Sequence, residues 1–180
     1  MRNAYILAAL CVCLFLSGCG GRSGEKEFES FSTDVRESEE LNFTAAVRAE
    51  TENSTVRFVL AYKGQGENCA ISVIEPELLS GVTLRYEKGK ALLDCAGTVV
   101  DTGELCEGVT PAGALPLIVS AMGSGHLDCV SKEGGETVFR IIPKDGIAVD
   151  VWVDESGTPT HAELIAEGRT VLFCDISDWR

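Results

Sequence analysis

Residues 110–123 read Thr-Pro-Ala-Gly-Ala-Leu-Pro-Leu-Ile-Val-Ser-Ala-Met-Gly, and this stretch decides the fold. Thr110 is a typical N-cap residue, and proline is common at the first position of a helix, where Pro111 lies. Gly123 is a typical residue for the C-terminal end of the helix. Pro116 predicts a kink or a second start. This helix has no polar face, so the rest of the chain must cover it on every side. A curved sheet around the helix satisfies that requirement, and so does a flap position over an apolar groove.

On both sides of this helix the hydrophobic period changes to two, which is typical of strands with one buried face. The first run, 41–49, alternates apolar and mostly polar side chains, and nine similar runs follow it. The ten runs are 41–49, 56–62, 69–73, 82–86, 91–95, 127–131, 137–143, 147–154, 159–166 and 170–176. Gly, Pro, Asn or Asp residues close them, and Asp145-Gly146 and Glu167-Gly168 are hairpin signals. We therefore expect about ten antiparallel strands, five before the helix and five after it.

A second helix is predicted upstream of the first strand. Phe28, Phe31 and Val35 have the spacing i, i+3, i+7 among charged residues, which indicates an amphipathic helix over residues 25–40. Ser32-Thr33-Asp34 are weak helix formers, so a disordered acidic linker is the alternative. The preceding residues 20–24, Gly-Gly-Arg-Ser-Gly, are typical of a flexible tether.

The N-terminus has the pattern of an export signal. Arg2 precedes an apolar run, residues 4–16, whose 13 residues are too few to span a membrane, which takes about 20. The run ends in Leu16-Ser17-Gly18-Cys19, which resembles the bacterial lipobox at every position. The alternative is an ordinary secretory peptide in which Cys19 has no special role.

The lipobox resemblance implies that Cys19 is lipidated and becomes the mature N-terminus. Two acyl chains of the palmitate type contribute on the order of 20 kcal/mol, which is lasting attachment to a membrane. The predicted organisation is a signal peptide over 1–18, a lipidated Cys and tether over 19–24, and one domain over 25–180. The expected location is the extracytoplasmic face of the cell membrane.

The charge balance excludes one class of partner. The chain has 28 Asp and Glu against 15 Lys and Arg, a net charge of -13. Nucleic acid binding needs a basic surface, so we expect no nucleic acid partner. Anionic headgroups would also repel this domain, so the lipid on Cys19, and no basic patch, is expected to hold it at the membrane.

Five cysteines remain after the lipobox: Cys69, Cys95, Cys106, Cys129 and Cys174. All except Cys106 alternate in step with the apolar residues of their strands, so each lies on the same face as those residues. This placement favours thiols packed in the core. One or two disulfides are the alternative, since the expected compartment is extracytoplasmic. Because five is odd, at least one thiol stays free or pairs with another chain. We expect Cys106 to be the most exposed.

The sequence gives no pattern for catalysis, a cofactor or a metal. His126 and Cys129 lie at i and i+3 of a strand, which places them on opposite faces. Ser124 precedes His126, but it follows a helix and lacks the Gly-x-Ser-x-Gly turn of a nucleophile elbow. Glu75 and Glu77 are close in sequence, but no neighbouring feature supports a role as paired carboxylates in acid-base catalysis. We therefore expect a protein that is not an enzyme.

The order of the elements resembles the lipoprotein-carrier superfamily (LolA/LolB-like). The likeness in order extends over 25–180 and includes Val73-Ile74-Glu75-Pro76 before Gly81. The segments 110–117 and 151–159 are similar to those of small uncharacterised lipoproteins of clostridia-type bacteria. The resemblance implies an α+β fold, mainly antiparallel β. The expected sheet is a curved, open half-barrel of about ten strands, with an N-terminal helix and a central apolar helix on its concave face.

The resemblance also implies that the concave face binds an acyl chain, a lipid or another apolar ligand. The expected lining residues are Phe43, Phe58, Leu60, Leu84, Leu115, Leu117, Ile118, Met122 and Val151. A soluble carrier has no lipobox, so Cys19 favours a resident protein over a shuttle. The alternative is a structural or protein-interaction lipoprotein of the envelope whose concave face is filled by its own helix.

Overall fold

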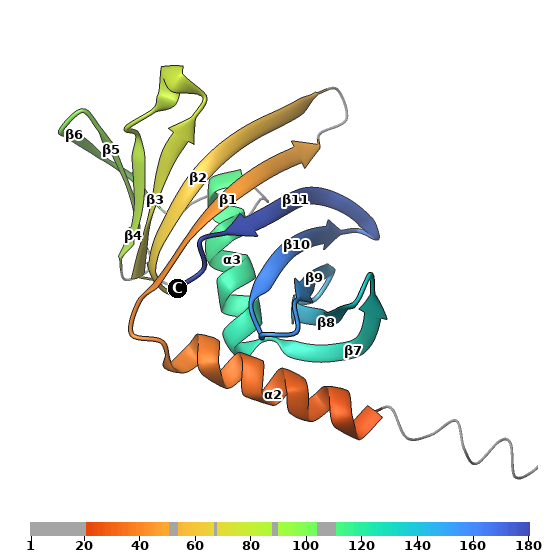
Figure 1. Ribbon diagram of the computed structural model, residues 1–180. Helices are drawn as coiled ribbons and strands as arrows, with labels where there is room; N and C mark the ends of the chain where they lie inside the picture. Colours follow the sequence, from red (N-terminus) through yellow and green to blue (C-terminus); the bar gives the residue numbers. More distant parts are fainter. Residues whose placement is uncertain (1–20, 51–53, 67, 88–89, 104–110) are drawn as a thin grey trace, which may run out of the picture.

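The computed structural model describes residues 21–50, 54–66, 68–87, 90–103 and 111–180 (Figure 1). The predicted signal peptide, Cys19 and Cys106 lie outside these residues. The elements are α2 (Gly21–Glu37), β1 (Leu41–Glu50), β2 (Thr55–Gln65), β3 (Asn68–Glu75), the short 3-10 helix η2 (Glu77–Leu79), β4 (Thr83–Glu87), β5 (Lys90–Cys95), β6 (Thr98–Gly103), α3 (Pro111–Ser124), β7 (His126–Glu133), β8 (Glu136–Lys144), β9 (Ile147–Val153), β10 (Pro159–Ala166) and β11 (Arg169–Ser177).

The strands form one antiparallel sheet in the order β6-β5-β4-β3-β2-β1-β11-β10-β9-β8-β7. Neighbouring strands are consecutive in sequence except at the centre, where β1 pairs with β11 from Thr44 opposite Ser177 to Ala49 opposite Leu172. The edges β6 and β7 do not pair with each other, so the sheet is an open half-barrel. The chain crosses from one edge to the other through α3, which lies within the curve of the sheet (Figure 1).

The predicted fold class is confirmed, with one strand more than expected. The missed strand is β6, where Val99 and Val100 are 56% and 52% exposed. An edge strand without a buried face has no alternation of polar and apolar residues, so the period-two signal is absent there.

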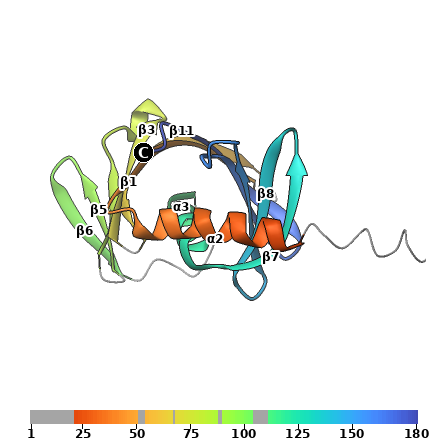
Figure 2. The ribbon, with the colours of Figure 1, turned by 60° about the horizontal axis from the view of Figure 1, so that its bottom comes forward.

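Helix α2 crosses the open end of the half-barrel (Figure 2). Its apolar face is buried as expected, and the Phe28 and Phe31 rings lie 5.3 and 5.5 Å from the Phe139 ring. The helix begins at Gly21 and ends at Glu37, four and three residues before the predicted limits of 25 and 40, so it includes residues 21–24 of the expected tether. Gly24 packs closely on Val130, whose side chain lies 3.0 Å from the position of an added Cβ. The absence of a side chain therefore brings the helix against β7.

Helix α3 occupies nearly the range expected, and Thr110, the predicted cap, lies outside the described residues. The buried Ser32 hydroxyl of α2 donates a hydrogen bond to the Gly123 carbonyl at 2.9 Å, which ties the two helices together. Gly125 follows α3, and a Cβ there would clash with the Ile141 side chain. A glycine is therefore required where the chain turns from α3 into β7.

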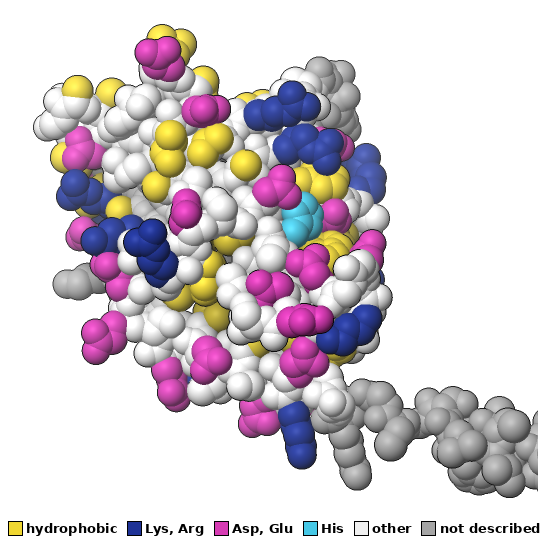
Figure 3. Space-filling view, viewed as in Figure 1, with side chains coloured by type: hydrophobic (Ala, Val, Ile, Leu, Met, Phe, Trp, Pro, Cys, Tyr) yellow, Lys and Arg dark blue, Asp and Glu magenta, His cyan; other side chains and the backbone are white. Residues whose placement is uncertain are grey.

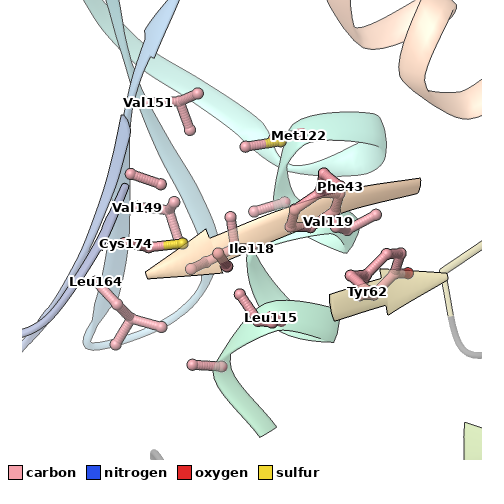
Figure 4. Packing of buried hydrophobic residues seen from close by; sticks show 14 of the residues in the cluster. Phe43, Tyr62, Leu115, Ile118, Val119, Met122, Val149, Val151, Leu164 and Cys174 are labelled. Carbon is pink, nitrogen blue, oxygen red and sulfur yellow. The ribbon is translucent and has the colours of Figure 1, made fainter. Parts of the chain in front are cut away.

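The core lies between α3 and the concave face of the sheet (Figure 4). Leu115, Ile118 and Met122 point from α3 toward strand residues such as Val149 and Val151, and all five are at most 1% exposed. The apolar residues of the core lie between Phe28 and Trp179. A fragment of residues 20–180 therefore contains the whole described core. None of the described helices is long and apolar enough to cross a membrane.

Candidate functional site

The residues expected to line an apolar binding site are mostly core residues. Seven of the nine are buried, with exposed fractions between 0 and 8%: Phe43, Leu60, Leu84, Leu115, Ile118, Met122 and Val151. Phe58 and Leu117 are half-buried and pack on the same core. Leu84 is buried on β4 but lies outside this cluster. The structure therefore brings eight of the nine together as packing around α3.

This packing decides between the two arrangements that an all-apolar helix allows. Helix α3 lies inside the curved sheet, and its Leu115 and Met122 side chains are fully buried. On the sheet side, Phe43 stacks on Tyr62 with 4.8 Å between ring centroids. The apolar concave face is therefore occupied by α3, which is not a flap over an open groove.

Two buried tyrosine hydroxyls interrupt the apolar packing, and no sequence pattern predicts them. Neither the Tyr62 nor the Tyr86 hydroxyl forms a well-formed hydrogen bond in the described part of the chain, and the weakly polar Cys69 thiol lies beside that of Tyr62. Burial raises the pKa of Tyr86 to about 12 and that of the neighbouring Cys69 to about 11. Both groups therefore stay protonated at neutral pH.

The convex face of the sheet carries a pocket of about 430 Å³. Its lining residues come from β1, β2, β3, β10 and β11, with Pro76 after β3: Ala46, Val47, Arg48, Arg57, Phe58, Val59, Glu75, Pro76, His161, Phe173 and Asp175. Figure 3 shows basic side chains next to hydrophobic ones on this face, with a His on the same face. No sequence pattern predicts this pocket, because most of its lining residues are outward-facing positions and they come from strands in both halves of the chain.

Several charged side chains of the pocket already have partners. The Arg48 guanidinium lies 3.9 Å from the centre of the Phe173 ring and 3.0 Å from a Glu50 carboxylate oxygen. His161 Nδ1 lies 2.7 Å from an Asp175 carboxylate oxygen. Its ring also packs edge-on against Trp152, with 5.0 Å between centroids.

The cysteine predictions were half right. Cys69 and Cys174 are buried free thiols, as expected, and burial raises the pKa of Cys174 to about 12. Cys95 and Cys129 are free but exposed. Cys95 is the last residue of β5, near the edge of the sheet. At Cys129 a register shift after Leu127 reverses the parity and pairs it with the outward-facing Arg140.

The described residues offer no catalytic pair at the Ser-His sequence. The Ser124 hydroxyl donates to the Ser120 carbonyl at 2.9 Å, within α3, so it is not directed at His126. Within the described ranges, no group of three or more His, Cys, Asp or Glu side chains could hold a metal ion.

An open antiparallel half-barrel with two helices on its concave side defines the class, which is the LolA-like fold. The sequence matches no family model and no curated protein. The structure is similar to a LolA superfamily protein from Nitrosomonas europaea, with a TM-score of 0.52 and 12% identity over 86% of this chain and 92% of that chain. It is also similar to a DUF1329 family protein from Desulfovibrio piger, with a TM-score of 0.50 and 10% identity over 88% of this chain and 92% of that one.

A third similar structure is the CwlD amidase from Clostridioides difficile in complex with the GerS lipoprotein. Its TM-score is 0.46, with 20% identity over 87% of this chain and 94% of that chain. The first two likenesses confirm the predicted fold, and at these identities they show the fold alone.

Proposed function

We propose that the chain is a lipid-anchored, non-catalytic interaction module on the extracytoplasmic face of the cell membrane. The lipobox at Cys19 supports the anchor. The observation that carries the rest is the burial of most apolar side chains of α3 within the half-barrel, with Leu115 and Met122 at 0% exposure. A core that its own helix fills leaves the outer surface for the function.

Moving α3 out of the half-barrel to open a groove would cost the free energy of its packing. Burial of one large apolar side chain contributes about 1.5–3 kcal/mol. For Leu115, Ile118 and Met122 together, displacement of the helix would forfeit roughly 5–9 kcal/mol unless a ligand replaced the contacts. A binding partner on the outer surface avoids this loss.

The outer surface has exposed apolar side chains that suit a protein partner. Val99 and Val100 lie on the edge strand β6, and Leu78 in η2 is 92% exposed. An edge strand presents unpaired backbone groups to a neighbouring chain, and exposed apolar residues mark interaction sites. We therefore place the interaction at the β6 edge.

Site-specific crosslinking in the native membrane tests this proposal. A photoreactive amino acid at Val99 or Val100 of the full chain should give a discrete protein adduct after illumination. The control position is Glu155, which is exposed in the turn between β9 and β10. Equal crosslinking at all three positions, or none at β6, would contradict the proposal.

A second candidate function is binding of an acyl chain in the concave face. Leu117 on α3 and Phe58 on β2 are the least buried of the nine lining residues, so a ligand would enter beside them. Uptake of a fluorescent fatty acid by residues 20–180 would support this function. The uptake should be lost in Leu117→Trp and kept in Glu155→Gln, and a protein that takes up no probe argues against it.

A further inference from the structure

We propose that the convex-face pocket binds a short peptide with free ends. In this arrangement Arg57 holds the peptide carboxylate, Glu75 holds its ammonium group and an apolar side chain lies on the floor. This inference does not rest on the proposed function, which uses the β6 edge. Nothing in the sequence patterns or in the fold likeness assigns this pocket.

The register of the strands builds the floor of the pocket from small apolar side chains. Ala46 on β1 is paired with Val59 on β2 and with Asp175 on β11. Val59 is in turn paired with Glu75 on β3. Ala46 and Val59, which have small side chains, therefore lie side by side between Asp175 and Glu75. This arrangement makes a depression with an apolar base and a carboxylate on each side.

Two arginines lie directly opposite each other at one end of this floor. Arg48 on β1 is paired with Arg57 on β2, and both line the pocket. Like charges opposite each other on one face are destabilising. Arg48 is partly neutralised by Glu50, whereas the Arg57 side chain has no ion pair or hydrogen bond to another described residue. An anionic group between the arginines would relieve the repulsion.

The other flank of the floor carries a carboxylate that is also unpaired. Glu75 lines the pocket, and its side chain forms no ion pair or hydrogen bond within the described ranges. Asp175, the carboxylate on the opposite side, is already bound to His161. The pocket thus presents one unpaired cation and one unpaired anion at two adjacent edges of an apolar floor, which matches a zwitterion with an apolar side chain.

The placement of the two residues suits a short ligand. Val59 is paired with Glu75 and lies two residues from Arg57, which corresponds to about 8 Å between the Cα atoms of Arg57 and Glu75. A dipeptide or tripeptide, at about 3.5 Å per residue, is long enough to reach both side chains. The volume of about 430 Å³ has room for a ligand of that size.

The experiment uses a ¹⁵N-labelled fragment of residues 20–180 and the probe L-leucyl-L-leucine. We expect saturable shifts of the backbone amide signals of Ala46, Val59 and Phe173. N-acetyl-L-leucyl-L-leucinamide, which lacks both charges, should bind at least about fivefold more weakly. Arg57→Gln and Glu75→Gln should each weaken binding of the free dipeptide about threefold or more. The matched control is Lys144→Gln, an exposed position outside the pocket, which should leave binding unchanged.

Three results would overturn the inference, provided that each variant keeps the signal dispersion of the parent. The first is the absence of saturable shifts up to about 20 mM dipeptide. The second is equal binding of the blocked dipeptide, which would assign the pocket to internal segments of a protein. The third is an equally strong response to inorganic phosphate, which would make it a plain anion site. Crosslinking at β6 is measured separately, so its outcome does not decide this test.

Discussion

Tyr62 is 1% exposed on β2, and its hydroxyl lies beside the weakly polar Cys69 thiol without a well-formed hydrogen bond to a described residue. A buried polar group without a partner lowers stability. We therefore expect Tyr62→Phe to keep or raise the free energy of unfolding, by about 1 kcal/mol, in urea titrations of residues 20–180. Tyr62→Ala should lower it by about 3–5 kcal/mol, because it also removes the ring. A clear loss of stability in Tyr62→Phe would show that the hydroxyl has a partner.

The buried thiols predict how stability depends on pH. Burial raises the pKa of Cys174 to about 12 and that of Cys69 to about 11, from an ordinary value of 9.0. Because the unfolded chain releases these protons at lower pH than the folded chain, the stabilisation is complete below about pH 9 and declines as the pH rises above it. Urea titrations between pH 7 and pH 11 should show this decline.

Two variants separate this effect from general alkaline denaturation. Cys174→Ala should lose less stability between pH 9 and pH 11 than the parent does, because it lacks one of the two buried thiols. Cys95→Ala changes an exposed thiol and should keep the full decline. Identical curves for all three proteins would contradict the role of burial.

At the scale of elements, α3 is the part of the core on which the account depends. Ile118 is 1% exposed, whereas Leu117 in the same helix is half-buried. Ile118→Ala should lower the free energy of unfolding by about 2–5 kcal/mol, and Leu117→Ala by clearly less. Urea titrations of the two variants measure this difference. Equally small effects would indicate that α3 is a mobile cover and not a core helix.

Most elements could be predicted from the sequence, because a hydrophobic period is a local property. The period-two runs located ten of the eleven strands, and the apolar stretch after residue 110 located α3. The exceptions also have local causes. The exposed edge strand β6 has no buried face to create a period, and the register shift beside Cys129 reverses the parity that the sequence suggested.

The candidate sites could be predicted only in part. The sequence identified the apolar residues of the concave face, but a filled groove and an open one have the same apolar pattern. Only the exposure of Leu115 and Met122 distinguishes them. The convex pocket could not be predicted, because it depends on the pairing of β1 with β11, which brings Arg48 beside Phe173 across more than half of the chain.

At the scale of the whole molecule, we propose that a lipid on Cys19 holds the domain at the membrane, because anionic headgroups repel a chain with a net charge of -13. We expect cells supplied with an alkyne analogue of palmitate to label the full chain. The label should be absent from Cys19→Ala and present in Cys11→Ala, whose cysteine lies in the predicted signal peptide. Labelling of Cys19→Ala at the parental level would contradict the assignment of Cys19.

The central claim is that the half-barrel is filled by its own helix, and native mass spectrometry tests it most directly. Residues 20–180 are purified without detergent, weighed under native conditions and then extracted for lipid. The account predicts the mass of the bare chain and an extract without acyl lipid. A mass increased by a bound acyl lipid, which Ile118→Trp abolishes and Glu155→Gln retains, would contradict it.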